Sequence, residues 1–127
     1  YIEQTQNDLF ADRQLRLMIE NGNRQVVGIV DLCSLDPLHN RAEVGIMVDK
    51  SCRRQGIGRN ALALLEEHCF RYLGIHQLFA YIAVENLPSR RLFAACGYKE
   101  SAVLKEWAHT FGGGYTDVLV VQKLNLS

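Results

Sequence analysis

The sequence lacks an excess of charge of either sign, with 14 basic and 14 acidic residues among 127. A chain without net charge has no field to steer nucleic acid or an anionic membrane surface, so its partner is expected to be small and locally anionic. Its apolar runs also stay well short of the roughly 20 residues that a membrane-spanning helix needs. These absences predict a protein that binds neither nucleic acid nor membranes.

Paired cysteines are missing as well. Cys33, Cys52, Cys69 and Cys96 are scattered, without a C-x-x-C pair and without histidine pairs at metal-ligand spacing. We therefore expect no metal site, and free thiols in a reducing cytoplasm. Because repeats, low-complexity tracts and linkers are also absent, residues 1–127 are expected to form a single domain.

The most informative segment that is present spans residues 53–59, with the sequence RRQGIGR. It follows an alternating apolar pattern over residues 42–48 and precedes a helical pattern over residues 57–73. Two glycines let the main chain turn sharply and approach a ligand, and the unpaired N–H groups of a helix N-terminus favour an anion. The segment is interpreted as a diphosphate-binding loop, with a plain surface turn as the alternative.

Periodicity predicts the other elements. Residues 1–12 are expected to hold a helix end and a connector, and Asn21-Gly22 is expected to supply the positive φ angles of a tight hairpin. Gly74 and Gly97 are placed as helix-ending residues in the left-handed region. Strands are predicted over residues 13–20, 25–31, 42–48, 78–84, 98–107 and 115–124, and helices over 57–73 and 86–96.

The resulting fold class is α+β. Three antiparallel strands come first, and the strand, helix and strand between residues 42 and 84 imply a parallel crossover. We expect a mostly antiparallel central sheet, flanked by helices, with one parallel strand pair at the phosphate loop.

A dinucleotide-binding protein is one alternative for the glycine loop. Gly56-x-Gly58-x-x-Ala61 satisfies that fingerprint, and Glu85 ends the next strand, where such folds place an acid on the ribose. The fingerprint normally opens an all-parallel unit, however, whereas here antiparallel strands come first. A Walker loop is excluded because no G-K-[ST] follows the glycines.

Three motifs in order resemble the GNAT superfamily of N-acetyltransferases. Arg53-x-x-Gly56-x-Gly58 matches its Q/R-x-x-G-x-G/A signature, residues 42–48 look like its fourth strand, and residues 86–98 resemble its later motif N-x-x-(S/A)-x-x-L-Y-x-x-x-G-F. Residues 41–43 and 111–115 resemble the corresponding segments in the branch of the family that contains spermidine and ribosomal-protein N-terminal acetyltransferases. Since the family carries one more strand and helix at the front, the resemblance implies an N-terminally incomplete domain.

The resemblance implies an acetyl-CoA-dependent N-acetyltransferase. The acetyl group would pass to a primary amine of a polyamine, another small amine or a protein N-terminus, by direct attack in a ternary complex; a homo-oligomer is left open. For Asn86, a plain helix cap is the alternative role. The implied cofactor-binding residues are Ile46, Met47, Val48, Arg53, Arg54, Gln55, Gly56, Ile57, Gly58, Arg59, Asn86, Ser89 and Phe93.

The reaction needs a base, because an alkylamine with a pKa near 10.4 is almost entirely ammonium at neutral pH. Glu43 is the first candidate, since it lies on the strand that leads into the phosphate loop, on the face opposite Val44. An exposed carboxylate or a pair with Arg41 is the alternative. Glu85 and His39 rank second and third.

The sequence differs from the family's motif at the position of the general acid, where Phe93 replaces the tyrosine of the motif. A phenyl ring donates no proton, so either the thiolate leaves unaided or Ser89, Tyr81, Tyr98 or water substitutes. Of these, Ser89 is named as a catalytic candidate. The same departure supports an alternative function, a catalytically weak CoA-binding regulatory module.

Overall fold

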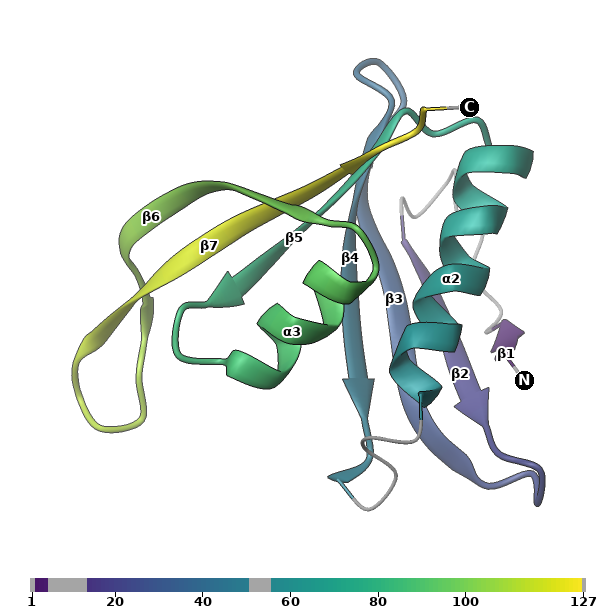
Figure 1. Ribbon diagram of the computed structural model, residues 1–127, viewed down its shortest axis with the longest axis horizontal. Helices are drawn as coiled ribbons and strands as arrows, with labels where there is room; N and C mark the ends of the chain where they lie inside the picture. Colours follow the sequence, from purple (N-terminus) through teal and green to yellow (C-terminus); the bar gives the residue numbers. More distant parts are fainter. Residues whose placement is uncertain (1, 5–13, 51–55, 127) are drawn as a thin grey trace.

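The computed structural model describes residues 2–4, 14–50 and 56–126, which form one seven-stranded sheet with helices packed on it (Figure 1). The strand order is β1-β2-β3-β4-β5-β7-β6, and every neighbouring pair is antiparallel except β4 and β5. The predicted α+β class is therefore confirmed. The strands are β1 (Ile2–Gln4), β2 (Leu15–Glu20), β3 (Val26–Asp36), β4 (Arg41–Val48), β5 (Gln77–Ala83), β6 (Lys99–His109) and β7 (Tyr115–Leu124).

Two local expectations were wrong. Residues 2–4, expected in a helix end and connector, form β1 and pair with β2. In the β2–β3 hairpin the positive φ falls on Arg24, at 60°, and not on Gly22. The Asn21 carboxamide accepts hydrogen bonds from Asn23 N (2.9 Å) and Gln25 N (3.0 Å), which holds a longer turn than the two-residue loop that Asn-Gly predicts.

The predicted helices are present with their glycine ends. Helix α2 (Ile57–Glu67) continues into a π-helical turn, η2 (His68–Tyr72), and Gly74 follows at φ 66°. Helix α3 (Leu87–Ala95) is followed by Gly97 at φ 92°. Among the described residues, no helix is long and apolar enough to cross a membrane.

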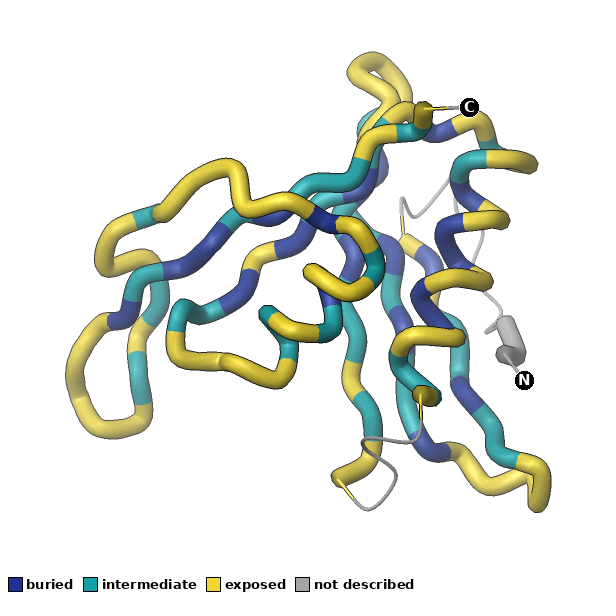
Figure 2. The backbone as a smooth tube through the Cα atoms, in the orientation of Figure 1, coloured by how far each residue is buried: buried dark blue, intermediate teal, exposed yellow. Residues whose placement is uncertain are grey.

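The core lies between α2 and the middle of the sheet (Figure 2). Leu62 and Leu65 of α2 are fully buried, as are Leu32 of β3 and Leu78 of β5. Full burial of such a side chain contributes roughly 1.5–3 kcal/mol, so this contact fixes α2 on the sheet. Phe93 of α3 belongs to the same cluster.

A buried ion pair joins α2, α3 and β7. The Lys123 ammonium contacts the Glu66 carboxylate, whose side chain is 8% exposed, and also donates to the carbonyl oxygen of Cys96 at the end of α3. Burial raises the pKa of Glu66, and the neighbouring ammonium opposes that rise. Lys123 therefore connects the C-terminal parts of both helices to one strand.

We predict that Lys123→Met lowers the free energy of unfolding by about 3 kcal/mol, because it leaves a buried carboxylate without its cation. The deficit should be smallest below the usual carboxyl pKa of about 4.3, where Glu66 is protonated in both states. It should grow as the pH rises, because the unfolded chain then ionises while the folded carboxyl retains its proton. Urea unfolding at several pH values measures this.

The double variant Glu66→Leu/Lys123→Met should recover most of the loss, since no buried charge remains. Lys105→Met is the matched control, because the Lys105 side chain is 80% exposed in its pair with Asp117 and its loss should leave stability unchanged. A Lys123→Met protein as stable as the parent at pH 7 would contradict the importance of the pair.

Candidate functional site

Strands β4 and β5 separate after a short parallel ladder. The register pairs residues 41–43 with 77–79, with Glu43 opposite Phe79 at its last position. Beyond this point β4 stays paired with β3 through Val48, while β5 stays paired with β7 through Ala83 (Figure 1). In the carboxyl-terminal half of β4, the backbone edge on the β5 side is therefore not paired with β5.

The N-terminus of α2 begins beside this opening. Gly56 is the N-cap and has a left-handed conformation, with φ 76° and ψ 5°, that residues with a Cβ rarely adopt. Its carbonyl oxygen accepts from Asn60 N at 2.9 Å and closes the first turn. The following helical N–H groups have no intrahelical acceptor, as at any helix start.

Gly58, the next glycine, also allows close packing between helices. A Cβ built there would lie 3.2 Å from Leu92 Cδ2 and 3.5 Å from Val48 Cγ2. Glycine thus allows the first turn of α2 to contact both α3 and the end of β4.

The N-terminus of α3 faces the same space. The Asn86 side chain caps the helix by accepting from Ser89 N at 3.3 Å. The loop before it is anchored, because Val84 N donates to Asp117 O (3.1 Å) and Arg90 Nη1 donates to Val84 O (2.8 Å). The cap that was an alternative role for Asn86 is therefore present.

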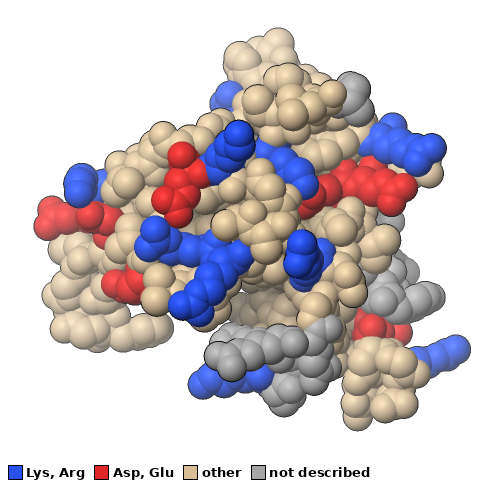
Figure 3. Space-filling model, in the orientation of Figure 1, with Lys and Arg blue, Asp and Glu red and all other residues tan. Residues whose placement is uncertain are grey.

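Between these three elements lies a cavity of about 630 Å³. Of its described lining residues only Arg59 and Arg91 are charged, and both are basic. Figure 3 shows basic side chains gathered around the hollow on this face. The lining residues are Ile46, Met47, Val48, Gly56, Ile57, Gly58, Arg59, Asn86, Pro88, Ser89, Arg91 and Leu92.

The cavity gathers most of the expected cofactor-binding residues from three separate elements. The predicted Arg53, Arg54 and Gln55 lie outside the described residues. Phe93 does not line the cavity: it is 3% exposed and packs edge-on against the Tyr98 ring at 4.9 Å. Its contact with a cofactor therefore remains a prediction.

Glu43, the first candidate base, lies at the last paired position of the β4–β5 ladder, three residues before the cavity-lining Ile46. Its Oε1 accepts a long hydrogen bond of 3.5 Å from Ser34 Oγ. The alternative pairing with Arg41 is not seen, since Arg41 lies 3.6 Å from Asp36. Glu43 is half-buried and close to the cavity without lining it.

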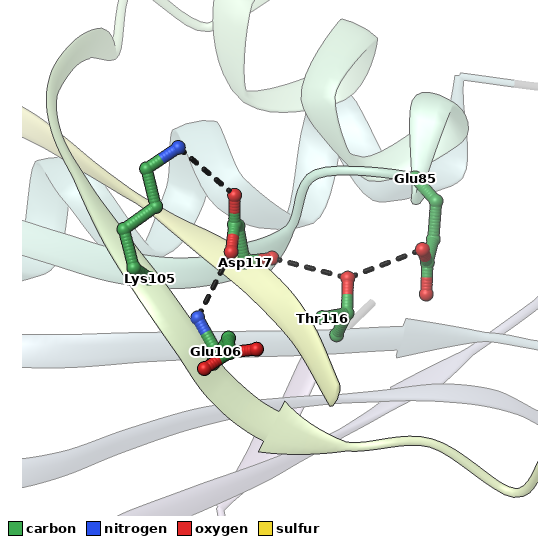
Figure 4. A network of polar contacts seen from close by, with 5 residues as sticks. All are labelled: Glu85, Lys105, Glu106, Thr116 and Asp117. Atoms are coloured by element: carbon green, nitrogen blue, oxygen red, sulfur yellow. Dashed lines mark hydrogen bonds and ion pairs between the residues drawn. The ribbon is translucent and has the colours of Figure 1, made fainter. Parts of the chain in front are cut away.

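The two lower-ranked bases are differently placed. Glu85 Oε2 accepts a hydrogen bond from Thr116 Oγ1 at 3.1 Å (Figure 4). The neighbouring Asp117 carboxylate accepts hydrogen bonds from Glu106 N and from the Lys105 ammonium. His39 lies in the turn before β4, at the end of that strand away from the cavity.

One candidate proton donor, Tyr98, is weakened by burial. The Tyr98 hydroxyl is buried without a hydrogen-bond partner in the described part of the chain, and burial raises its pKa far above the usual value. Burial, with the charge of Glu43, also raises the pKa of the Cys33 thiol. The residues that the structure describes contain no cluster of three or more potential metal ligands.

Sequence reasoning missed Pro88, Arg91 and Leu92. Leu92 falls on the leucine of the motif over residues 86–98, which was not predicted to line a site. The available signal was helical spacing, because Ser89 and Leu92 lie three residues apart on one face, and Pro88 and Arg91 form the neighbouring row.

Comparison with known proteins gives a consistent result. The family model described as an acetyltransferase (GNAT) domain matches residues 1–99. The spermidine N(1)-acetyltransferase of Vibrio cholerae is 27% identical over 103 residues, covering 81% of this chain and 59% of that protein. An N-acetyltransferase 9-like protein of Nematostella vectensis is 35% identical over 96 residues, covering 68% and 48%. The chain thus spans about half the length of the curated relatives it matches.

The fold agrees with solved structures. A spermidine N-acetyltransferase from Vibrio cholerae, described as a dodecamer in an intermediate state, superposes with a TM-score of 0.84 at 25% identity, covering 92% of this chain and 68% of that one. A manganese complex of the spermidine/spermine N-acetyltransferase from that organism gives 0.82 at 26% identity, covering 88% and 65%.

Proposed function

Because this chain belongs to the GNAT acetyltransferase family, we propose that it binds acetyl-CoA in the cavity between β4, α2 and α3 and transfers the acetyl group to a primary amine. The observation that carries the proposal is the combination of surfaces in that one cavity. A strand end, a helix N-terminus and two cations meet there, without an acidic lining residue among those described. This set suits a long ligand that carries phosphates.

Each surface fits a different part of acetyl-CoA. The β4 edge at Ile46 and Met47 faces away from β3, so its main chain could pair with the amides of the pantetheine arm as an added strand would. The first turn of α2, after Gly56, would receive the diphosphate on its N–H groups and positive dipole end. Asn86 and Ser89 line the far wall, on α3.

The proposed reaction forms a bond between the amine nitrogen and the acetyl carbon and breaks the carbon–sulfur bond of the thioester. Before attack the ammonium must lose a proton, which Glu43 would accept directly or through water. After attack the nitrogen loses its second proton and the departing thiolate takes one up, so that the overall reaction releases one proton. Among the candidate proton donors to the thiolate we favour Ser89, because its side chain is half-buried at the cavity wall.

Polyamines are the acceptor class that we propose first, because relatives from Vibrio cholerae and Escherichia coli are named spermidine N(1)-acetyltransferases. A homo-oligomer is proposed on the same ground, since one solved relative is described as a dodecamer. Sedimentation velocity of the purified protein would measure the assembly.

The function is tested by following thiol release from acetyl-CoA with polyamines, amino acids and peptide N-termini as acceptors. Spermidine or spermine should give the highest kcat/KM. Tight acetyl-CoA binding without release for any acceptor would instead support the regulatory module. Thermal stabilisation by NADH but not by CoA would contradict both.

We predict that Gly58→Glu abolishes acetyl-CoA binding, because it adds bulk and negative charge at the proposed diphosphate site. Isothermal titration calorimetry should show at least about a 100-fold loss of affinity, in line with the loss of two charge-assisted hydrogen bonds. Gly22→Glu is the matched control, because a Cβ at Gly22 meets nothing within 4 Å and Gly22 lies in the β2–β3 hairpin. Unchanged affinity in Gly58→Glu would remove the phosphate assignment.

For Glu43→Gln we predict a fall in kcat of about 100-fold at neutral pH, with acetyl-CoA affinity unchanged, because an amide cannot accept the amine proton. Glu67→Gln is the control, since Glu67 is an exposed carboxylate paired with Arg71 on the surface of α2 and η2. A Glu43→Gln enzyme with parental kcat would transfer the role of base to another group.

A further inference from the structure

Two neighbouring arginines of α3 have different surroundings. Arg90 makes contacts within the protein: it donates a hydrogen bond to Val84 O at 2.8 Å and forms an ion pair with Glu100 at 3.3 Å. Arg91 is exposed, lines the cavity, and has no ion-pair partner among the described residues. Its charge is therefore available to a ligand.

Arg59 is the second cation of this kind. It also lines the cavity, and it forms none of the ion pairs found among the described residues. Its guanidinium lies near enough to Cys96, at the end of α3, to oppose the rise in the pKa of that thiol. Arg59 thus extends from α2 toward α3.

Both cations lie beside the contact between the two helices. Because Gly58 packs against Leu92, the residues next to them, Arg59 and Arg91, flank the same junction. The first turn of α2 also lies next to the end of β4, because a Cβ at Gly58 would be 3.5 Å from Val48 Cγ2. The two arginines, here called the rim, line the same cavity, and Figure 3 shows basic side chains around a hollow on this face.

CoA carries phosphate at two places, the diphosphate and a separate monophosphate on the 3′ oxygen of its ribose. A monophosphate carries about 1.5–2 negative charges at neutral pH and accepts several charge-assisted hydrogen bonds, for which guanidinium is well shaped. With the α2 amides assigned to the diphosphate, the rim has two cations left for the second anion.

We propose that Arg91, together with Arg59, binds the 3′-phosphate and makes this site select CoA over dephospho-CoA. The inference rests on the proposed function and deepens it, because it concerns the ligand of the same cavity. It assigns a specificity-determining role to a residue outside the glycine loop.

The test is calorimetric titration of the whole protein with CoA and with dephospho-CoA, which differ only in that phosphate. The parent should bind CoA about 10-fold more tightly or better, as expected for charge-assisted hydrogen bonds at an exposed site. Arg91→Gln should weaken CoA binding and leave dephospho-CoA binding unchanged, so that the preference falls to about 2-fold. Arg91→Lys should retain part of the preference.

Arg71→Gln is the matched control, because Arg71 is exposed on η2, pairs with Glu67 and does not line the cavity. Equal binding of the two ligands by the parent would overturn the inference while leaving the acetyl-CoA proposal intact. An equal loss for both ligands in Arg91→Gln would overturn it too, by assigning Arg91 to the diphosphate. If the parent bound neither ligand, the proposed function would fail, and the inference with it.

Discussion

The early separation of β4 from β5 is the constraint on which the rest of the structure depends. Only residues 41–43 and 77–79 pair, and each strand then follows its antiparallel neighbour on the other side. A continuous sheet would satisfy the β4 edge and leave nothing for a ligand to pair with. The separation also makes room for two helix N-termini beside one strand end, which is what creates the cavity.

Holding that opening at a fixed width requires contacts at both ends of the helices. At the cavity, Gly58 lets α2 contact Leu92 of α3. At the far end, Lys123 contacts Glu66 of α2 and the last turn of α3. A buried ion pair contributes little net stability when compared with apolar packing. Its value here is geometric, because one ammonium specifies where two helices end relative to one strand.

Local rules predicted most of the backbone and less of the site. The left-handed glycines at 74 and 97 follow from helix C-termini, which short sequence windows contain. The hairpin at Asn21-Gly22 is present, but its predicted two-residue turn is wrong, because the Asn21 side chain stabilises a turn in which Arg24 takes the positive φ. Gly58 was assigned to phosphate approach, yet its packing against Leu92 depends on a residue 34 positions later. No local pattern separates Arg91 from Arg90, since only the fold gives Arg90 its partners.

The proton balance of the proposed reaction follows from the same packing. Phe93 and Tyr98 form a buried edge-on pair, and the Tyr98 hydroxyl is held where burial opposes its ionisation. The Phe93 ring has no proton to donate, and Tyr98 is not among the residues that line the cavity. Among the described lining residues Ser89 has the only hydroxyl. A CoA thiolate with a pKa near the 8.5 of cysteine is a tolerable leaving group without help, whereas an ammonium with a pKa near 10.4 cannot attack at all. In the proposed reaction, proton removal from the acceptor therefore demands more of this site than proton delivery to sulfur, and Glu43 at the β4–β5 junction is the base that we propose for it.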